Sequence, residues 1–140
     1  MTGLPAELER VVIVALVAAL FVAASLGVRT WVRRATDSRL GRVLAHPVRL
    51  DDPTLPTIIY FFGQRCGACS AQRAELSLLP GNARANVVAV DAHESADLAG
   101  WAGVLTVPST AVIDPRRRLL AVNHGFVPAT TLVSQIRLSA

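Results

Sequence analysis

Residues 57–79 read TIIYFFGQRCGACSAQRAELSLL, and this stretch decides the fold. Its first six residues are an unbroken β-branched and aromatic run between a proline and a glycine, which is typical of a strand buried on both faces. Residues 68–79 have helical periodicity and end at a Pro-Gly-Asn turn. One side of this predicted helix collects Ala71, Ala74 and Leu78. A CGAC motif lies where the strand passes into the helix.

The rest of the chain continues the alternation of strand and helix. Further strands are predicted at 87–90, 110–113 and 119–122, the first of them buried and the last two forming a hairpin. A short helix over 94–102 would turn Leu98, Trp101 and Ala102 inward, and Pro128 suits the first turn of a final helix. The predicted order is therefore β-α-β-α-β-β-α, an α/β fold with a mixed central sheet.

The N-terminal region has the character of a membrane anchor. Residues 11–28 contain no charge, and as a helix they would span roughly 27 Å, close to a hydrocarbon core of about 30 Å. The alternatives are a cleavable signal peptide and a buried core helix. A signal peptide needs a basic start, whereas Glu7 and Glu9 outnumber Arg10 here. A core helix of this length would need more protein around it than remains.

We therefore expect a retained single-pass transmembrane helix. The predicted division is a short tail at 1–10, the transmembrane helix at 11–28, an Arg-rich juxtamembrane linker at 29–50 and the α/β domain at 51–140.

The net charge of +4 is concentrated in the linker. Residues 29–50 contain six arginines against one aspartate, whereas residues 51–140 balance seven acids with seven arginines. A nucleic-acid domain would spread its basic residues over a folded face, so this distribution argues against nucleic acid and for the lipid bilayer as a partner. Because Arg29, Arg33 and Arg34 follow the apolar segment, the positive-inside rule favours a cytoplasmic domain at the cell membrane. An extracytoplasmic domain is the alternative.

Cys66 and Cys69 are the only cysteines in the chain. A thiolate at a helix N-terminus meets unpaired N–H groups, which lowers its pKa, so we expect Cys66 to be the nucleophile, with Arg65 adding to the effect. Cys69, one turn further along, suits the resolving role. A structural zinc site usually needs four ligands, and the three histidines are scattered, so no metal site is predicted within one chain. A metal bridging two chains and a purely structural disulfide remain alternatives.

Over residues 56–138 the chain resembles the thioredoxin family. The resemblance rests on the strand–CGAC–helix unit, the strand ending at Asp91, the Val107-Pro108-Ser109-Thr110 segment and Gly125 before the last helix. It implies that Pro108 is cis and faces the cysteines. It also implies a substrate groove shaped by Pro108, with the backbone of Val107 pairing with a bound peptide and Arg65 beside the first cysteine.

The chain departs from the pattern of that family at several site positions. The dipeptide between the cysteines is Gly-Ala where Gly-Pro is usual, and Arg65 stands where a tryptophan is common. Tyr60 takes the place of a buried acid that helps to deprotonate the second cysteine, and Val87 that of its lysine partner. Tyr60 and His124 are accordingly the candidate proton shuttles.

These observations predict a membrane-tethered thiol–disulfide oxidoreductase that acts on protein disulfides. No organic cofactor is implied, because the redox-active disulfide is Cys66–Cys69 itself, and electrons would come from an upstream dithiol reductant. The substrates would be protein thiols and disulfides, including membrane-bound ones. Two rivals stay open: a non-catalytic binding or assembly module of a membrane complex, and a thiol metal carrier.

Overall fold

The computed structural model describes residues 6–138, which divide into two compact units that meet between Asp37 and Ser38. The first unit contains the helix α1, Ala6–Asp37. The second contains β1 (Thr57–Phe62), α2 (Cys69–Ser77), β2 (Asn86–Asp91), α3 (Ala96–Ala102), β3 (Ser109–Ile113), β4 (Leu119–His124) and α4 (Ala129–Arg137). The predicted order of elements is confirmed.

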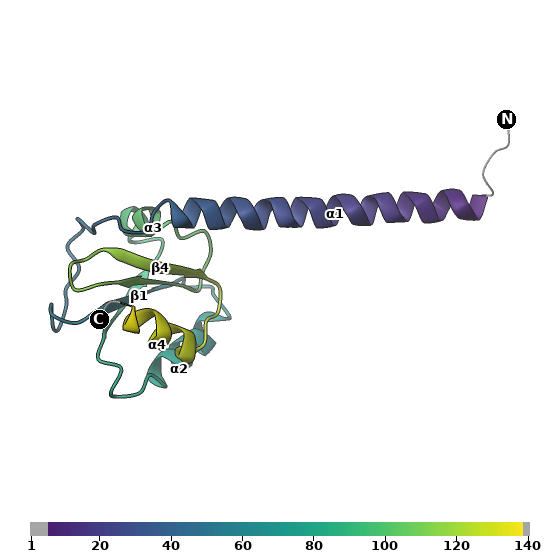
Figure 1. The fold of residues 1–140 in the computed structure, drawn as a ribbon. Helices are drawn as coiled ribbons and strands as arrows, with labels where there is room; N and C mark the ends of the chain where they lie inside the picture. The colour runs from purple at the N-terminus through teal and green to yellow at the C-terminus, as the bar shows by residue number, and fades with distance from the viewer. Residues whose placement is uncertain (1–5, 139–140) are drawn as a thin grey trace. The chain divides into compact units, whose positions relative to one another are not determined.

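A four-stranded mixed sheet in the order β2-β1-β3-β4 forms the centre of the second unit (Figure 1). β1 pairs in parallel with β2 across the α2 crossover and antiparallel with β3, which forms the hairpin with β4. All of β1 except Phe62 is buried, as its β-branched and aromatic composition predicts. The fold is therefore a thioredoxin-like α/β fold.

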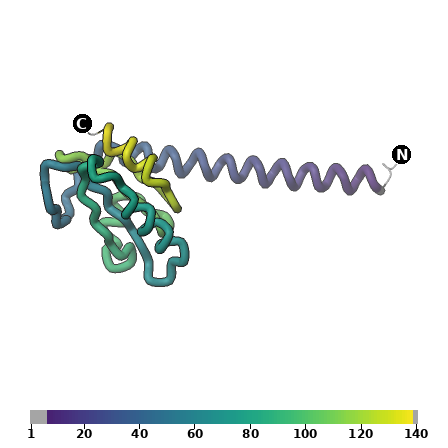
Figure 2. The backbone as a smooth tube through the Cα atoms, turned by 90° about the horizontal axis from the view of Figure 1, so that it is seen from below, coloured from purple at the N-terminus to yellow at the C-terminus, as the bar shows by residue number. Residues whose placement is uncertain are grey.

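Helices cover both faces of this sheet. Figure 1 shows α3 on one side of the strands, and α2 with α4 on the other, where Figure 2 shows the last two side by side. Alternate residues of β1 separate the two cores: Ile59 and Phe61 pack on the α3 side, Ile58 and Tyr60 on the α2–α4 side. This alternation places Tyr60 in the same core as Cys69.

The strand β2 differs from the prediction of a fully buried strand. It lies at the edge of the sheet, and Val87 is 44% exposed. Among the described residues, the segment before β1 forms no strand that pairs with β2. The outer edge of β2 and part of one of its faces therefore remain open to solvent.

The chain between α1 and β1 contributes to the core more than the predicted boundary at residue 51 implies. Leu44 is only 2% exposed and belongs to the core on the α3 side. Backbone hydrogen bonds join Gly41 and Arg42 to Leu119, and Leu44 to Arg117, so residues 41–44 form a strap along the start of β4. We call these four residues the strap.

The helix α1 is long and apolar enough to cross a membrane. Its 32 residues correspond to about 48 Å at about 1.5 Å per residue, and its apolar side chains are exposed, Leu20 to 70% and Phe21 to 73%. The helix extends beyond the predicted span at both ends, through residues 6–10 and through the arginines up to Asp37. Residues 1–5 of the predicted tail, and 139–140 of the predicted domain, lie outside the described part of the chain.

Candidate functional site

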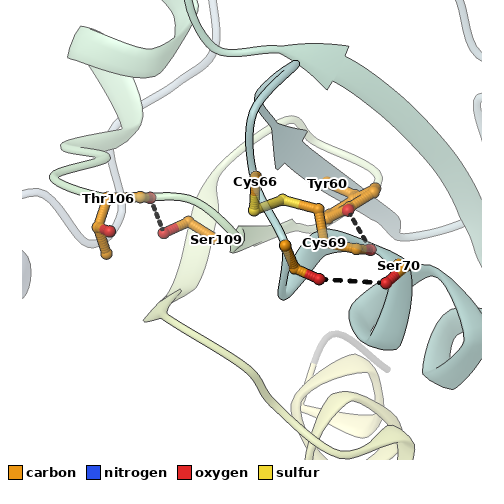
Figure 3. Close-up of a disulfide and its surroundings, with 7 residues drawn as sticks. Tyr60, Cys66, Cys69, Ser70, Thr106 and Ser109 are labelled. Carbon is orange, nitrogen blue, oxygen red and sulfur yellow. Dashed lines mark hydrogen bonds between the residues drawn. A yellow bond between two sulfur atoms is a disulfide. The ribbon is translucent and has the colours of Figure 1, made fainter.

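Cys66 and Cys69 form a disulfide at the point where the loop after β1 enters α2 (Figure 3). Their sulfur atoms are 2.01 Å apart and their Cα atoms 5.4 Å apart. Cys69 is the first residue of α2 and is 7% exposed, whereas Cys66 lies in the preceding loop and is only half-buried. The two sulfurs are therefore unequally accessible, with Cys66 on the solvent side.

The N-terminus of α2 favours negative charge near these sulfurs. Within residues 6–138, the N–H groups of Ser70 and Ala71 meet no acceptor, and no acidic residue occupies the first turn. The hydroxyl of Ser70 donates to the carbonyl oxygen of Gly67 at 3.2 Å (Figure 3). A thiolate formed on Cys66 would thus lie beside the positive end of the helix dipole.

The second wall of the site is the loop before β3. The peptide bond between Val107 and Pro108 is cis, as the resemblance implies. Val107 lines an open groove of about 410 Å³ together with Cys66, Arg65, Gly63, Gly67 and Ala68. Pro108, the next residue, is buried. The structure therefore brings Val107 and Arg65 to the first cysteine.

Gly63 lets Val107 approach the loop before Cys66 closely, a feature that the sequence prediction missed. A methyl group on Gly63 would lie 3.2 Å from the Cγ2 atom of Val107 and 4.0 Å from the Cβ atom of Cys66. The only signal in the sequence was a glycine between the strand and the CxxC motif, which we interpreted as the end of the strand.

Tyr60 lies beneath the cysteines in the α2–α4 core. Its hydroxyl donates a buried hydrogen bond to the carbonyl oxygen of Cys69 at 2.8 Å (Figure 3). Burial raises the pKa of Tyr60, and the positive charge of Arg73 opposes that effect. The hydroxyl is therefore a neutral donor at ordinary pH, directed at the backbone of the second cysteine.

His124 is the last residue of β4. It pairs with Ser109 at the end of the hairpin, and strand alternation puts it on the same face as Val122, in the α3 core. Both ring nitrogens are buried without a hydrogen-bond partner among the described residues, and burial lowers the pKa of this histidine. The structure thus separates the two candidate shuttles onto opposite faces of the sheet.

A buried glutamine, also missed, connects α2 to the loop before α4. The Nε2 group of Gln72 donates to the carbonyl oxygen of Val127 at 3.0 Å, and its Oε1 atom accepts the N–H of Val127 at 2.8 Å. The N–H of Gly125 donates to the carbonyl oxygen of Pro108 at 2.8 Å. The loop 125–127 is therefore fixed between the cis-proline loop and the helix that follows the cysteines.

No group of three or more His, Cys, Asp or Glu side chains gathers in a metal-binding arrangement within residues 6–138. The disulfide between the two cysteines is a geometry that can support thiol–disulfide exchange at Cys66.

A mixed sheet with helices on both faces, a CxxC disulfide at the start of α2 and a cis-proline beside it define the class of thioredoxin-like proteins. No family model matches the chain. A curated relative is thioredoxin 2 of Plasmodium berghei (strain Anka), 29% identical over 82 residues, which cover 57% of this chain and 52% of that protein. The chain thus spans about half the length of this relative.

Solved structures agree with this assignment of the fold. A malarial protein is 25% identical, with a TM-score of 0.53, over 61% of this chain and 97% of its own. Thioredoxin-2, a component of the protein secretion machinery of the malaria parasite, is 22% identical, with a TM-score of 0.55, over 70% and 93%. A mutant thioredoxin from Halobacterium salinarum is 21% identical, with a TM-score of 0.54, over 60% and 74%. The chain is similar to thioredoxins in both sequence and fold.

Proposed function

We propose that this protein is a membrane-tethered thiol–disulfide oxidoreductase that exchanges its Cys66–Cys69 pair with disulfides and dithiols of other proteins. The thioredoxin-like fold with a redox-type disulfide supports such an activity in general terms. The single observation behind the assignment of roles is the unequal exposure of the two sulfurs at the N-terminus of α2.

In the reducing direction, the Cys66 thiolate attacks one sulfur of a substrate disulfide. The substrate S–S bond breaks, and its other sulfur leaves with the bonding electron pair and takes a proton from water. Cys69 then gives its proton to water, and its thiolate attacks the Cys66 sulfur. The mixed disulfide breaks, the second substrate thiolate leaves, and two electrons have passed from the cysteine pair to the substrate.

The reverse sequence oxidises a substrate dithiol and starts from the disulfide form that the structure holds. In the reducing direction an upstream dithiol restores the Cys66–Cys69 dithiol, without an organic cofactor. Tyr60 is the group that we propose to position Cys69 for this step, because its hydroxyl donates to the carbonyl oxygen of that residue.

The activity is tested with the full chain in detergent, by following reduction of a protein disulfide with dithiothreitol as the electron donor. We expect Cys66→Ser to reduce the rate to that of dithiothreitol alone. Cys69→Ser should instead accumulate a mixed disulfide between Cys66 and the substrate, visible as a mass increase that a reductant reverses. A wild-type rate equal to that of Cys66→Ser would contradict the proposal and favour a non-catalytic binding module.

We further propose that α1 confines the domain to the surface of a membrane, where a membrane-bound substrate is met at high effective concentration. The test replaces α1 by a soluble tag and measures the redox state of substrates in cells. Activity should fall although the purified domain keeps its rate. Unchanged activity in cells would rule out the role of the tether.

A further inference from the structure

Two exposed side chains, one in the groove of Cys66 and one in the loop bonded to Pro108, differ in chemistry and are not used by the exchange reaction itself. Arg65 precedes Cys66 in the wall of the groove, and Phe126 lies in the loop 125–127. We propose that these residues select the substrate: an extended segment of a protein in which the reactive cysteine has an acidic residue on one side and an apolar residue on the other. This inference rests on the proposed function and specifies its substrate.

Among the described residues, Arg65 provides the only charge in the wall of the groove. Its side chain is exposed, and neither ion pair found in the described part of the chain involves it. The carboxylates on neighbouring elements have other partners: Glu75 accepts the N–H of Ala129, and Asp91 accepts the N–H groups of His93 and Glu94. Arg65 is thus available to a carboxylate that a substrate brings, and it repels a basic one.

Phe126 is 53% exposed, although hydrogen bonds hold the residues before and after it in the chain. Gly125 is hydrogen-bonded to Pro108, the residue after Val107 in the groove, and Val127 is held twice by Gln72. A large apolar side chain is therefore held exposed next to the cis-proline wall. An apolar residue of the substrate that covers this ring would remove both surfaces from water.

Arg65 and Phe126 lie on separate segments of the chain, which suits an extended peptide as the occupant. An extended segment advances about 3.3 Å per residue, so residues one to three positions from a bound cysteine lie within about 10 Å of it. Arg65 adjoins Cys66 in the chain, whereas Phe126 lies on a separate loop beyond Pro108. A substrate with its acid and its apolar residue on opposite sides of the cysteine satisfies both contacts at once.

The test measures the rate of capture of short peptides by the reduced full chain bearing Cys69→Ser, in detergent at low salt. Each peptide contains one cysteine joined in a disulfide to thionitrobenzoate. The Cys66 thiolate attacks the peptide sulfur, the bond to thionitrobenzoate breaks, and the coloured thionitrobenzoate anion leaves with the electron pair. Mass spectrometry confirms that the peptide is the group bound to Cys66.

The peptides differ only at the two flanking positions, in both orders: Glu with Leu, Ala with Leu, Arg with Leu, and Glu with Ser. We expect capture of the Glu–Leu peptide about five- to tenfold faster than the Arg–Leu peptide, with a difference that shrinks as salt is raised. We also expect it to be captured about threefold faster than the Glu–Ser peptide. Ratios between peptides are compared within each variant, which removes any change in the reactivity of Cys66.

Substitutions assign each preference to its residue. Arg65→Glu should reverse the order of the Glu–Leu and Arg–Leu peptides, whereas Arg84→Glu, the same change of charge in the turn before β2, should leave it as it was. Phe126→Ser should abolish the preference for Leu over Ser and keep the preference for Glu over Arg. Leu78→Ser, an exposed residue at the other end of α2, is the matched control.

Equal rates for all peptides would overturn the selectivity and leave the oxidoreductase intact. A preference that Arg65→Glu and Phe126→Ser do not change would also overturn it, because other residues would then be responsible. Capture no faster than by Cys66→Ser would overturn the proposed function, and the inference with it.

Discussion

At the scale of single residues, Tyr60 connects the sheet to the redox helix. It is 1% exposed, and its hydroxyl donates to the carbonyl oxygen of Cys69 at 2.8 Å. Its position in the middle of a buried strand could be predicted from the residues around it. Its partner could not, because the hydrogen bond depends on how α2 packs over β1.

Because Tyr60 is the only tyrosine, its ionisation can be followed directly by ultraviolet absorbance. Burial raises its pKa above 10.0 in the folded state, so we expect the absorbance midpoint of the folded protein above that of the unfolded chain. Since the neutral hydroxyl is favoured by folding, its contribution to stability is complete below about pH 10 and is lost as pH rises through the raised pKa.

Tyr60→Phe is the control for this titration: it should remove the absorbance change and lower the free energy of unfolding by about 0.5–1.5 kcal/mol at neutral pH. A folded-state midpoint at or below that of the unfolded chain would contradict the burial of the hydroxyl.

At the scale of elements, the buried face of α2 differs from the side on which the sequence pattern gathers small and apolar residues. The periodicity places Ala71, Ala74 and Leu78 on one side of the helix, and there Leu78 is 67% exposed. The inner face consists of Cys69, Gln72 and Leu76. A hydrophobic pattern cannot identify a buried glutamine, because its burial depends on the backbone groups of a distant loop.

Leucine is apolar and would suit a buried position, yet we expect Gln72→Leu to lower the stability of the protein. Gln72→Leu would leave the N–H and the carbonyl oxygen of Val127 buried without partners, at about 1–3 kcal/mol each. Denaturant unfolding measures the loss. Gln64→Leu, an exposed glutamine in the loop before Cys66, should change stability by less than about 0.5 kcal/mol. Equal effects of the two substitutions would contradict this interpretation.

The predicted domain boundary at residue 51 left the strap, residues 41–44, outside the domain. We expect Leu44→Ala to destabilise the domain by about 2–5 kcal/mol, because Leu44 is buried in the α3 core. Val43→Ala, one residue earlier and 61% exposed, should lower the stability by less than about 0.5 kcal/mol.

The same reasoning predicts that a soluble domain starting at Ser38 is more stable than one starting at Asp51. The midpoints of thermal unfolding of the two domains measure this difference. Equal midpoints would mean that the strap contributes no stability.

At the scale of the whole molecule, the two units differ in the exposure of their apolar side chains. The apolar side chains of α1 are exposed along the helix, whereas the second unit buries its apolar residues around the sheet. The membrane tether that we propose for α1 would remove this apolar surface from water. The arginines after the apolar stretch lie at residues 29–34, on the side of the chain that leads to the domain.

From this asymmetry we predict that the domain lies in the cytoplasm. A membrane-impermeant maleimide, applied to intact cells after mild reduction, should label Cys66 and Cys69 only after lysis. A variant with both cysteines replaced by serine sets the background. Labelling of intact cells would place the domain outside and reverse the predicted topology.

The sequence by itself was enough to determine the order of strands and helices, the apolar N-terminal helix and the position of the CxxC motif at a strand-to-helix junction. These features depend on local periodicity and on turn residues, which neighbouring positions in the chain specify. Only the tertiary structure decided on which face of the sheet His124 lies, that Gln72 holds the loop before α4, and that the strap packs along β4. Each of these depends on a contact between residues far apart in the chain, and periodicity contains no information about such partners.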